Sequence, residues 1–190
     1  PELAAQETVS VPVPRVDETR CTYCRRCAEV CAFKAISVLG RAVLVFPELC
    51  HGCGACRYFC PEQAISEEER PIGVVEKGYA GPVAFVQGRL DIGEPLAPPV
   101  IRQVKEHLET GVTAILDAPP GTSCPVVETV KGSDFCLLVT EPTPFGLHDL
   151  ALAFEVAHKL GVPSGVVLNR AGLGDEMVVD FCRQKGIPLL

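Results

Sequence analysis

The sequence contains one short cysteine pattern twice, and this repeat limits what the chain can form more than any other feature. The second run lies 29 residues after the first, so that Cys21 corresponds to Cys50. The eight cysteines of the repeat are Cys21, Cys24, Cys27, Cys31, Cys50, Cys53, Cys56 and Cys60. Their spacing presents three thiolates from one tight loop and the fourth just after it. Because iron takes a thiolate at each corner of a [4Fe–4S] cluster, the pattern predicts two such clusters.

The ligands of the two clusters are expected to cross between the runs. In two-cluster chains with this spacing, the fourth cysteine of each run ligates the other cluster. We assign to the first cluster Cys21, Cys24, Cys27 and Cys60. We assign to the second cluster Cys50, Cys53, Cys56 and Cys31. Residues 17–66 resemble a bacterial-type ferredoxin with two clusters, although Ala32 rather than Pro follows Cys31. Structural zinc, which also uses four cysteines, is the alternative.

The composition bears on the compartment and on the partners. The chain has 17 Lys and Arg against 24 Asp and Glu, a net charge of −7, which argues against nucleic acid or an anionic membrane as partner. No apolar run approaches the ~18 residues that span a bilayer. Eleven cysteines without a signal peptide favour a reducing cytoplasm, where thiols bind metals. We therefore expect a cytoplasmic protein without a nucleic-acid or membrane partner.

The residues after the cysteine repeat alternate between short apolar runs and amphipathic stretches. The predicted strands are residues 81–86, 112–117, 134–140 and 164–169. The predicted helices are residues 98–111, 124–132, 146–161 and 175–186. Such alternation predicts a parallel sheet covered on both faces, with a ligand beyond the carboxyl ends of the strands.

Polar residues follow three of these predicted strands. Asp117 ends one apolar run and leads into the Pro-Pro-Gly of "DAPPGTSCP". A carboxylate at this place is typical of Mg²⁺ binding beside a nucleotide, and the bare backbone of Gly121 is able to approach a phosphate. Taken alone, the motif is also compatible with a simple turn. Glu141 and Asn169 follow the next two predicted strands.

With "VTEPTPFGLHDL" and "VVLNR" in register, residues 70–190 resemble the MinD/ParA/Mrp-type P-loop ATPases. More narrowly, the chain is similar to the MinD-superfamily ATPases that carry an inserted two-cluster ferredoxin domain. The resemblance implies that Asp117 orients Mg²⁺ through water and that Gly121 senses the γ-phosphate of ATP. It also implies that Asn169 contacts adenine, with Arg170 and Pro188 beside it.

The phosphate-binding loop of this family, G-x-x-x-x-G-K-[ST], does not occur in the sequence. The family carries it on a strand that precedes the first residue here, so we expect an internal fragment that is inactive as an ATPase. The expected fold is an α/β, parallel-sheet P-loop NTPase-like core of the deviant Walker A type, with an inserted α+β ferredoxin module. The expected parts are the end of the N-terminal core region and a linker, the ferredoxin insert, and an incomplete ATPase core, at residues 1–16, 17–68 and 69–190.

Two functions are consistent with these patterns. The first is an iron–sulfur, ATP-binding protein that couples its nucleotide state to electron transfer or to the assembly and insertion of metal clusters. It would need a redox partner or a cluster recipient, and the resemblance makes a homodimer possible. The alternative is a plain two-cluster ferredoxin whose α/β part is a docking domain that hydrolyses nothing. A MinD-like positioning role would need a membrane-binding or DNA-binding surface, which this acidic sequence does not indicate.

Overall fold

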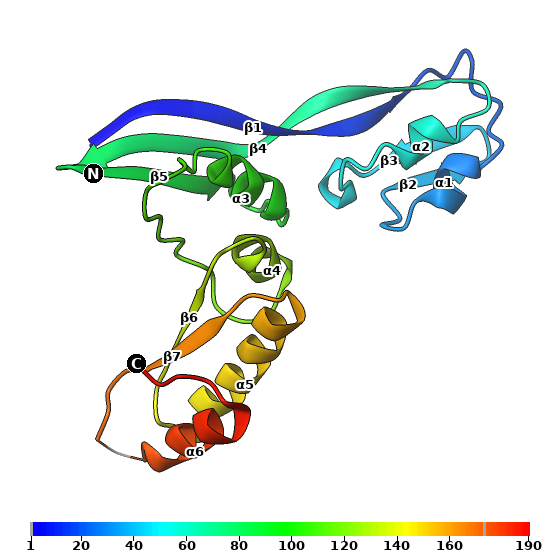
Figure 1. The fold of residues 1–190 in the computed structure, drawn as a ribbon. Coiled ribbons are helices and arrows are strands. Elements are labelled where there is room, and N and C mark those ends of the chain that lie inside the picture. The colour runs from blue at the N-terminus through cyan, green and yellow to red at the C-terminus, as the bar shows by residue number, and fades with distance from the viewer. Residues whose placement is uncertain (1, 173) are drawn as a thin grey trace. The chain divides into compact units, whose positions relative to one another are not determined.

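The computed structural model describes residues 2–172 and 174–190 and divides into two units, residues 1–108 and 109–190. The first unit consists of a long antiparallel ribbon and a small cysteine-bearing module, and the second consists of two parallel strands with helices (Figure 1). Each unit is described by itself.

The ribbon of the first unit is a three-stranded antiparallel sheet. β4 (Ile65–Ala80) lies between β1 (Glu2–Val16) and β5 (Val83–Leu90). Val9, Val11 and Val13 of β1 are all buried, as the period of two along a strand requires for residues on one face. The ribbon therefore has one apolar face, which needs a cover.

Helix α3 (Pro98–Lys105) supplies this cover and begins with proline, which suits the first helical turn. Its Val100 is buried together with Ile72 and Val75 of β4. Gly88 of β5 permits the close approach, because a Cβ atom there would lie 2.4 Å from Cγ1 of Val100. The main core of the first unit thus lies between α3 and the ribbon.

The cysteine-bearing module lies at one end of the ribbon (Figure 1). It contains two short helices, a hairpin and a 3-10 turn: α1 (Arg26–Val30), β2 (Ile36–Leu39), β3 (Ala42–Val45), η1 (Pro47–Leu49) and α2 (Ala55–Tyr58). Its own core of buried residues is small and consists of Cys27, Ile36, Val38 and Ile65. Packing alone gives such a module little stability, and metal bonds are the usual supplement in domains of this size.

The second unit contains the parallel pair β6 (Cys136–Thr140) and β7 (Ser164–Leu168), with Leu189 bridging to Val166 in parallel. Its helices are α4 (Cys124–Val130), α5 (Pro144–Lys159) and α6 (Glu176–Lys185). The Thr143 hydroxyl accepts a 2.9 Å hydrogen bond from the Gly146 amide and so caps α5. The core of this unit comprises Leu138, Leu150, Val166, Val178, Cys182 and Ile187.

All four predicted helices are confirmed, although the helix predicted for residues 98–111 ends at Lys105. The strands predicted for residues 134–140 and 164–169 are confirmed and are parallel. The run at residues 81–86 was expected in a parallel sheet, and this is wrong. Only Gly81 and Pro82 separate β4 from β5, and so short a connection joins antiparallel strands.

The strand predicted for residues 112–117 is also wrong, because within the described residues this segment pairs with no other strand. An apolar sequence alone does not make a strand, since backbone hydrogen bonds need a neighbour. The P-loop fold of residues 69–190 stays a prediction, as does the domain boundary after residue 68, which lies within β4.

The longest helix in the described part of the chain is α5, with 16 residues. No helix there has both the length and the apolar character that a membrane crossing demands.

Candidate metal centres

Two hollows in the module each gather four cysteines from both runs. The first, of about 360 Å³, is lined by Cys21, Cys24, Cys27 and Cys60. The second, of about 400 Å³, is lined by Cys50, Cys53, Cys56 and Cys31. These are the two crossed sets that the sequence assigned. Across residues 2–172 and 174–190, no three His, Cys, Asp or Glu side chains gather closely enough to hold a single metal ion.

The loops that carry the first three cysteines of each run have the same backbone conformation. Tyr23 and Arg25 have φ angles of 55° and 67°, and the corresponding Gly52 and Gly54 have 65° and 71°. All four φ angles lie in the left-handed region, which residues other than glycine seldom adopt. The sequence repeat is therefore a repeat of local structure.

The fourth cysteine of each run accepts a backbone hydrogen bond in the same way. The Ala35 amide donates to Sγ of Cys31, and the Ala64 amide donates to Sγ of Cys60, each over 3.3 Å. In the first loop, the Tyr23 amide donates to Sγ of Cys21 over 3.4 Å. Amides aimed at sulfur favour the thiolate, and they tune the potential of a bound iron–sulfur cluster. The thiol environment therefore fits such a cluster.

Burial acts on the thiols in the opposite sense. It raises the pKa of Cys56 to about 11 and also raises the pKa of Cys27, because the low-dielectric surroundings disfavour the charged thiolate. A metal ligand must be deprotonated, so loading of these sites releases protons and becomes less favourable at acidic pH.

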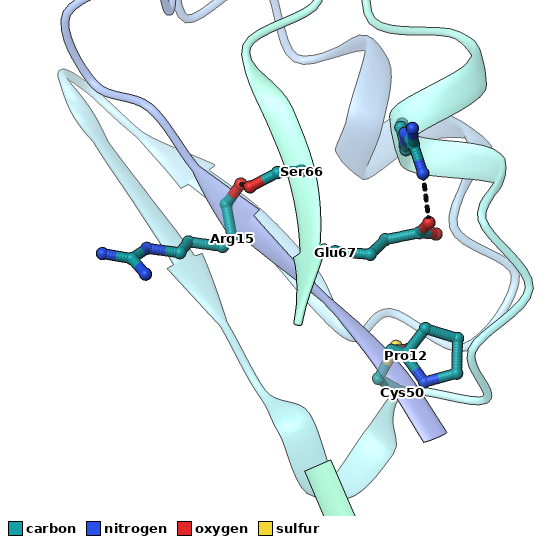
Figure 2. Close-up of polar contacts among 6 residues, drawn as sticks. Pro12, Arg15, Cys50, Ser66 and Glu67 are labelled. Carbon is teal, nitrogen blue, oxygen red and sulfur yellow. Dashed lines mark hydrogen bonds and ion pairs between the residues drawn. The ribbon is translucent and has the colours of Figure 1, made fainter. Parts of the chain in front are cut away.

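The second hollow is covered by the ribbon, which sequence reasoning missed. Pro12 and Pro14 of β1 and Glu67 of β4 contribute to its lining. Sγ of Cys50 lies 4.0 Å from the carbonyl oxygen of Pro12, and Figure 2 shows the two residues in contact beside Glu67. Glu67 corresponds in the repeat to Val38, which lines the first hollow. The only sequence signal for this difference is the replacement of a valine by a glutamate at equivalent places.

An aromatic pair also lines the second hollow. The rings of Phe33 and His51 stack with their centroids 3.6 Å apart and an interplanar angle of 7°. Both side chains are partly open to solvent, and the pair joins the two halves of the repeat. The stack shields one wall of the hollow from water.

The residues predicted to bind a nucleotide lie in the second unit, and two of them, Asn169 and Arg170, contact residues at the end of β6. Glu141 follows β6, and its Oε1 lies 3.3 Å from Nε of Arg170, which follows β7. The backbone N–H of Asn169 donates a 2.8 Å hydrogen bond to the backbone carbonyl of Thr140. The carboxyl ends of β6 and β7 therefore form one polar rim, as expected for parallel strands.

The other predicted nucleotide residues are placed differently. Asp117 and Gly121 are exposed and lie in a segment without helix or strand, and Gly121 has a φ of 92°. The Pro188 carbonyl accepts a 2.9 Å hydrogen bond from the Val166 amide, so this residue lies beside the middle of β7 rather than at its end.

Comparison with known proteins supports the cysteine-bearing module directly. The family described as "4Fe-4S binding domain" matches residues 14–37 and 43–66. Two uncharacterized proteins of Methanocaldococcus jannaschii are similar to the chain. One is 31% identical over 177 residues, which are 92% of this chain and 63% of that protein. The other is 32% identical over 157 residues, which are 82% of this chain and 55% of that protein.

A third relative is hydrogenase-4 component A of Escherichia coli, which is 35% identical over 101 residues, or 52% of this chain and 45% of that protein. The chain thus spans between 45% and 63% of the length of these relatives. The two family matches cover both cysteine runs, so the chain contains two 4Fe-4S binding domains in a ferredoxin-type module.

Proposed function

We propose that this chain transfers electrons through two [4Fe–4S] clusters with crossed ligation. The observation that carries the proposal is the pair of hollows, each lined by three cysteines of one run and the fourth cysteine of the other. The first cluster is bound by Cys21, Cys24, Cys27 and Cys60, and the second by Cys50, Cys53, Cys56 and Cys31.

The bound clusters supply reversible exchange of single electrons. The residues of the chain hold the clusters and limit access of water. Val38, Val43 and Ile65 line the first hollow, and Pro12, Pro14 and Ile36 line the second. Apolar walls and amide–sulfur hydrogen bonds both act on the reduction potential of a cluster.

Anaerobic reconstitution tests this proposal. We expect about eight irons and about eight acid-labile sulfides per chain, with electron paramagnetic resonance signals of two interacting clusters after reduction. Cys124→Ser is the matched control, because Cys124 lies on α4 and lines neither hollow. A chain that bound zinc tightly and formed no iron–sulfur chromophore would overturn the proposal.

We further propose that the second unit binds ATP and couples nucleotide state to the clusters. The resemblance to the MinD/ParA/Mrp-type ATPases supports this, as does the polar rim at the carboxyl ends of β6 and β7. In this role Asp117 orients Mg²⁺, Gly121 approaches the γ-phosphate, and Asn169 contacts adenine. The positive φ of Gly121 suits a backbone that approaches a phosphate.

Isothermal titration with Mg-ATP, together with a phosphate-release assay, tests the nucleotide proposal. We expect Asp117→Asn to suppress hydrolysis and Asn169→Ala to weaken binding. The 190-residue chain has no G-x-x-x-x-G-K-[ST], so we expect it to bind ATP weakly by itself. Equal ATP affinity of the unaltered protein and the Asn169→Ala variant, or equal hydrolysis by the unaltered protein and the Asp117→Asn variant, would contradict the assignment.

The proposed partner is a redox protein, because the similarity to hydrogenase-4 component A links the module to an oxidoreductase component. Delivery of clusters to a recipient protein is the second candidate. An assay with an apo-ferredoxin acceptor separates them. Iron that moves to the apo-ferredoxin indicates delivery. In a parallel assay with oxidised cytochrome c as a one-electron acceptor, reduction of the cytochrome while the iron stays on the chain indicates electron transfer.

A further inference from the structure

The two repeats differ in side chains between their second and third cysteines. Arg25 and Arg26 occupy the two positions in the first repeat, and Gly54 and Ala55 occupy them in the second. The backbone is shared, since Arg25 and Gly54 have φ angles of 67° and 71°. The difference is therefore one of side chains on a common loop.

The second loop has no room for larger side chains. A Cβ atom on Gly54 would lie 3.2 Å from Oε1 of Glu67, and one on Gly52 would lie 3.0 Å from Cδ of Pro12. Both β4 and β1 therefore pack onto this loop. The ribbon therefore borders the second loop at Gly52 and Gly54, while Cys53 between them is exposed.

The first loop, residues 21–27, is open. Cys24, Arg25 and Arg26 are exposed, and both arginines border the first hollow. Tyr23 and Arg25 adopt left-handed angles that glycine would adopt without strain, as in the second repeat. Arg25 thus places a cation at a position where the backbone conformation favours glycine.

The side chains of the cysteine-bearing module are less acidic than those of the rest of the chain, before the negative charge of bound clusters is counted. Residues 17–66 contain six basic and five acidic residues, whereas the rest of the chain contains 11 basic and 19 acidic residues. Arg20 also lies beside the first hollow, since its Nη2 donates to the Glu62 carbonyl over 2.9 Å. Glu62 borders the same hollow, and Asp17 nearby is engaged by the Thr19 hydroxyl at 2.6 Å. Within residues 21–27 the charged side chains are Arg25 and Arg26, both basic, while Glu18 and Glu29 flank the loop along the chain.

We propose that the cationic loop, residues 21–27, is the docking surface for an electron-transfer partner protein with a carboxylate-rich surface. The partner exchanges electrons with the first cluster, because Arg25 and Arg26 border the first hollow, whereas the equivalent residues of the second loop, Gly54 and Ala55, carry no charge. One electron passes in each encounter, each side changes its oxidation state by one, and no bond or proton is transferred. This proposal rests on the two-cluster function proposed above.

Outer-sphere oxidants of opposite charge test the proposal on the reconstituted, reduced chain. The probes are the tris(oxalato)cobaltate(III) trianion and the hexaamminecobalt(III) trication, each mixed with the protein in a stopped-flow instrument. The variant Arg25→Gly/Arg26→Ala gives the first loop the residues that the second loop already carries on the same backbone. Arg26→Ala alone is the milder variant, because Arg26 begins helix α1 in regular conformation.

At low ionic strength we expect the double variant to react about 5- to 10-fold more slowly with the trianion and faster with the trication. The differences should shrink at high salt, where the Debye length falls to about 3 Å at 1 M. Poly-L-glutamate, a stand-in for an acidic protein surface, should slow the reaction of the unaltered chain and not that of the variant. Inorganic phosphate at equal ionic strength should not reproduce this inhibition.

Two control variants separate the loop from the net charge. Arg25→Lys/Arg26→Lys should restore the rates. Arg183→Gln/Lys185→Gln on α6 removes the same charge outside both hollows and should leave the rates unchanged. Equal rates in the unaltered chain and the Gly/Ala variant, or an equal decrease in the α6 variant, would overturn the proposal.

Iron and sulfide analysis of every variant comes first and separates the two levels of the proposal. If the unaltered chain forms no clusters, the proposed function itself fails. If all variants hold about eight irons and the rates do not depend on the loop, the clusters stand and the docking surface is refuted.

Discussion

Glu67 of β4 and Arg57 of α2 form an ion pair, with Oε2 and Nη1 2.6 Å apart, at the edge of the second hollow. The bond is drawn as a dashed line at Glu67 in Figure 2. Arg57 is 60% exposed and Glu67 is 23% exposed, so the pair adds little to stability, as is usual at a protein surface. Its importance lies in the placement of a carboxylate beside a cluster site.

Glu67→Gln should raise the reduction potential of the second cluster. A nearby negative charge disfavours the reduced, more negative state of a cluster, so its removal stabilises that state by on the order of 1 kcal/mol. Potentiometric titration followed by electron paramagnetic resonance measures the change. The control is Glu68→Gln, which removes the same charge from the neighbouring, more exposed residue, outside the lining of the hollow. Equal shifts of the reduction potential in both variants would contradict a specific effect of Glu67 on the second cluster.

Paired cysteine variants should reveal the crossed ligation. Cys60→Ser and Cys21→Ser/Cys60→Ser should each keep about four irons, because both remove ligands of the first cluster only. Cys50→Ser/Cys60→Ser should keep almost none, because its two cysteines serve different clusters. Iron and sulfide analysis after reconstitution gives the answer. If the Cys50/Cys60 variant kept a complete cluster while the Cys21/Cys60 variant kept none, ligation would follow the sequence runs.

Removal of the clusters should unfold the module before the ribbon. The module has four buried core residues, whereas the core of the ribbon, α3 and the preceding Leu96 has seven, among them the fully buried Ile72 and Val75. After treatment with an iron chelator, the amides of β2 and β3 should lose hydrogen-exchange protection while those of Val9 and Val75 keep it. Full protection of β2 and β3 in the cluster-free chain would show that packing alone suffices.

The stability of the ribbon should fall at acidic pH because of Glu76. Gln87 Nε2 and Arg89 Nη2 donate to its carboxylate over 2.7 Å and 3.3 Å, and they lower the pKa of Glu76 below its ordinary value of 4.5. A carboxyl whose pKa is depressed on folding stabilises the fold above its unfolded pKa, and this stabilisation is lost as the pH falls through the folded pKa.

Urea denaturation of the cluster-free chain between pH 7 and pH 3, followed by the amide signal of Val75, measures this dependence. Glu76→Gln should make the curve flatter below about pH 4.5. The prediction fails if that variant and the unaltered chain lose stability in parallel over this range.

The cysteine spacing was sufficient to predict two cluster sites, which the two family matches confirm, because the ligands of each run lie close together in the sequence. The crossed ligand sets stay a prediction, and the lining of the two hollows is consistent with them. The helices of the second unit were equally readable, since their apolar period and their start signals are local. Gly161, which follows the end of α5 and has a φ of 70°, is a local stop signal of this kind, whereas the start at Pro144 lies two residues before the predicted one. These features depend on residues that lie close together in the sequence.

The sequence was a poor guide wherever the structure depends on a distant partner. Residues 112–117 are as apolar as a strand, yet whether they form one is decided by a neighbouring strand. β5 was predicted to lie in a parallel sheet, but it pairs with β4 in the antiparallel direction because the connection between the two strands is short. Asn169 and Glu141 were placed at strand ends from sequence, but the contact between Glu141 and Arg170 required the pairing of β6 and β7.

The sequence by itself determined that two equivalent loops bind metal, because the repeat of cysteines fixes the local chemistry. The sequence also shows that the side chains of the two loops differ, but only the tertiary structure decided that Pro12 and Glu67 border the second loop. Pro12 lies 38 residues before Cys50 along the chain, and Glu67 lies on the strand that pairs with β1. Their contact with the second loop arises because long antiparallel pairing brings both strands to that hollow and leaves the loop with Arg25 uncovered. Pairing between distant strands is a property of the whole fold, which no local pattern encodes.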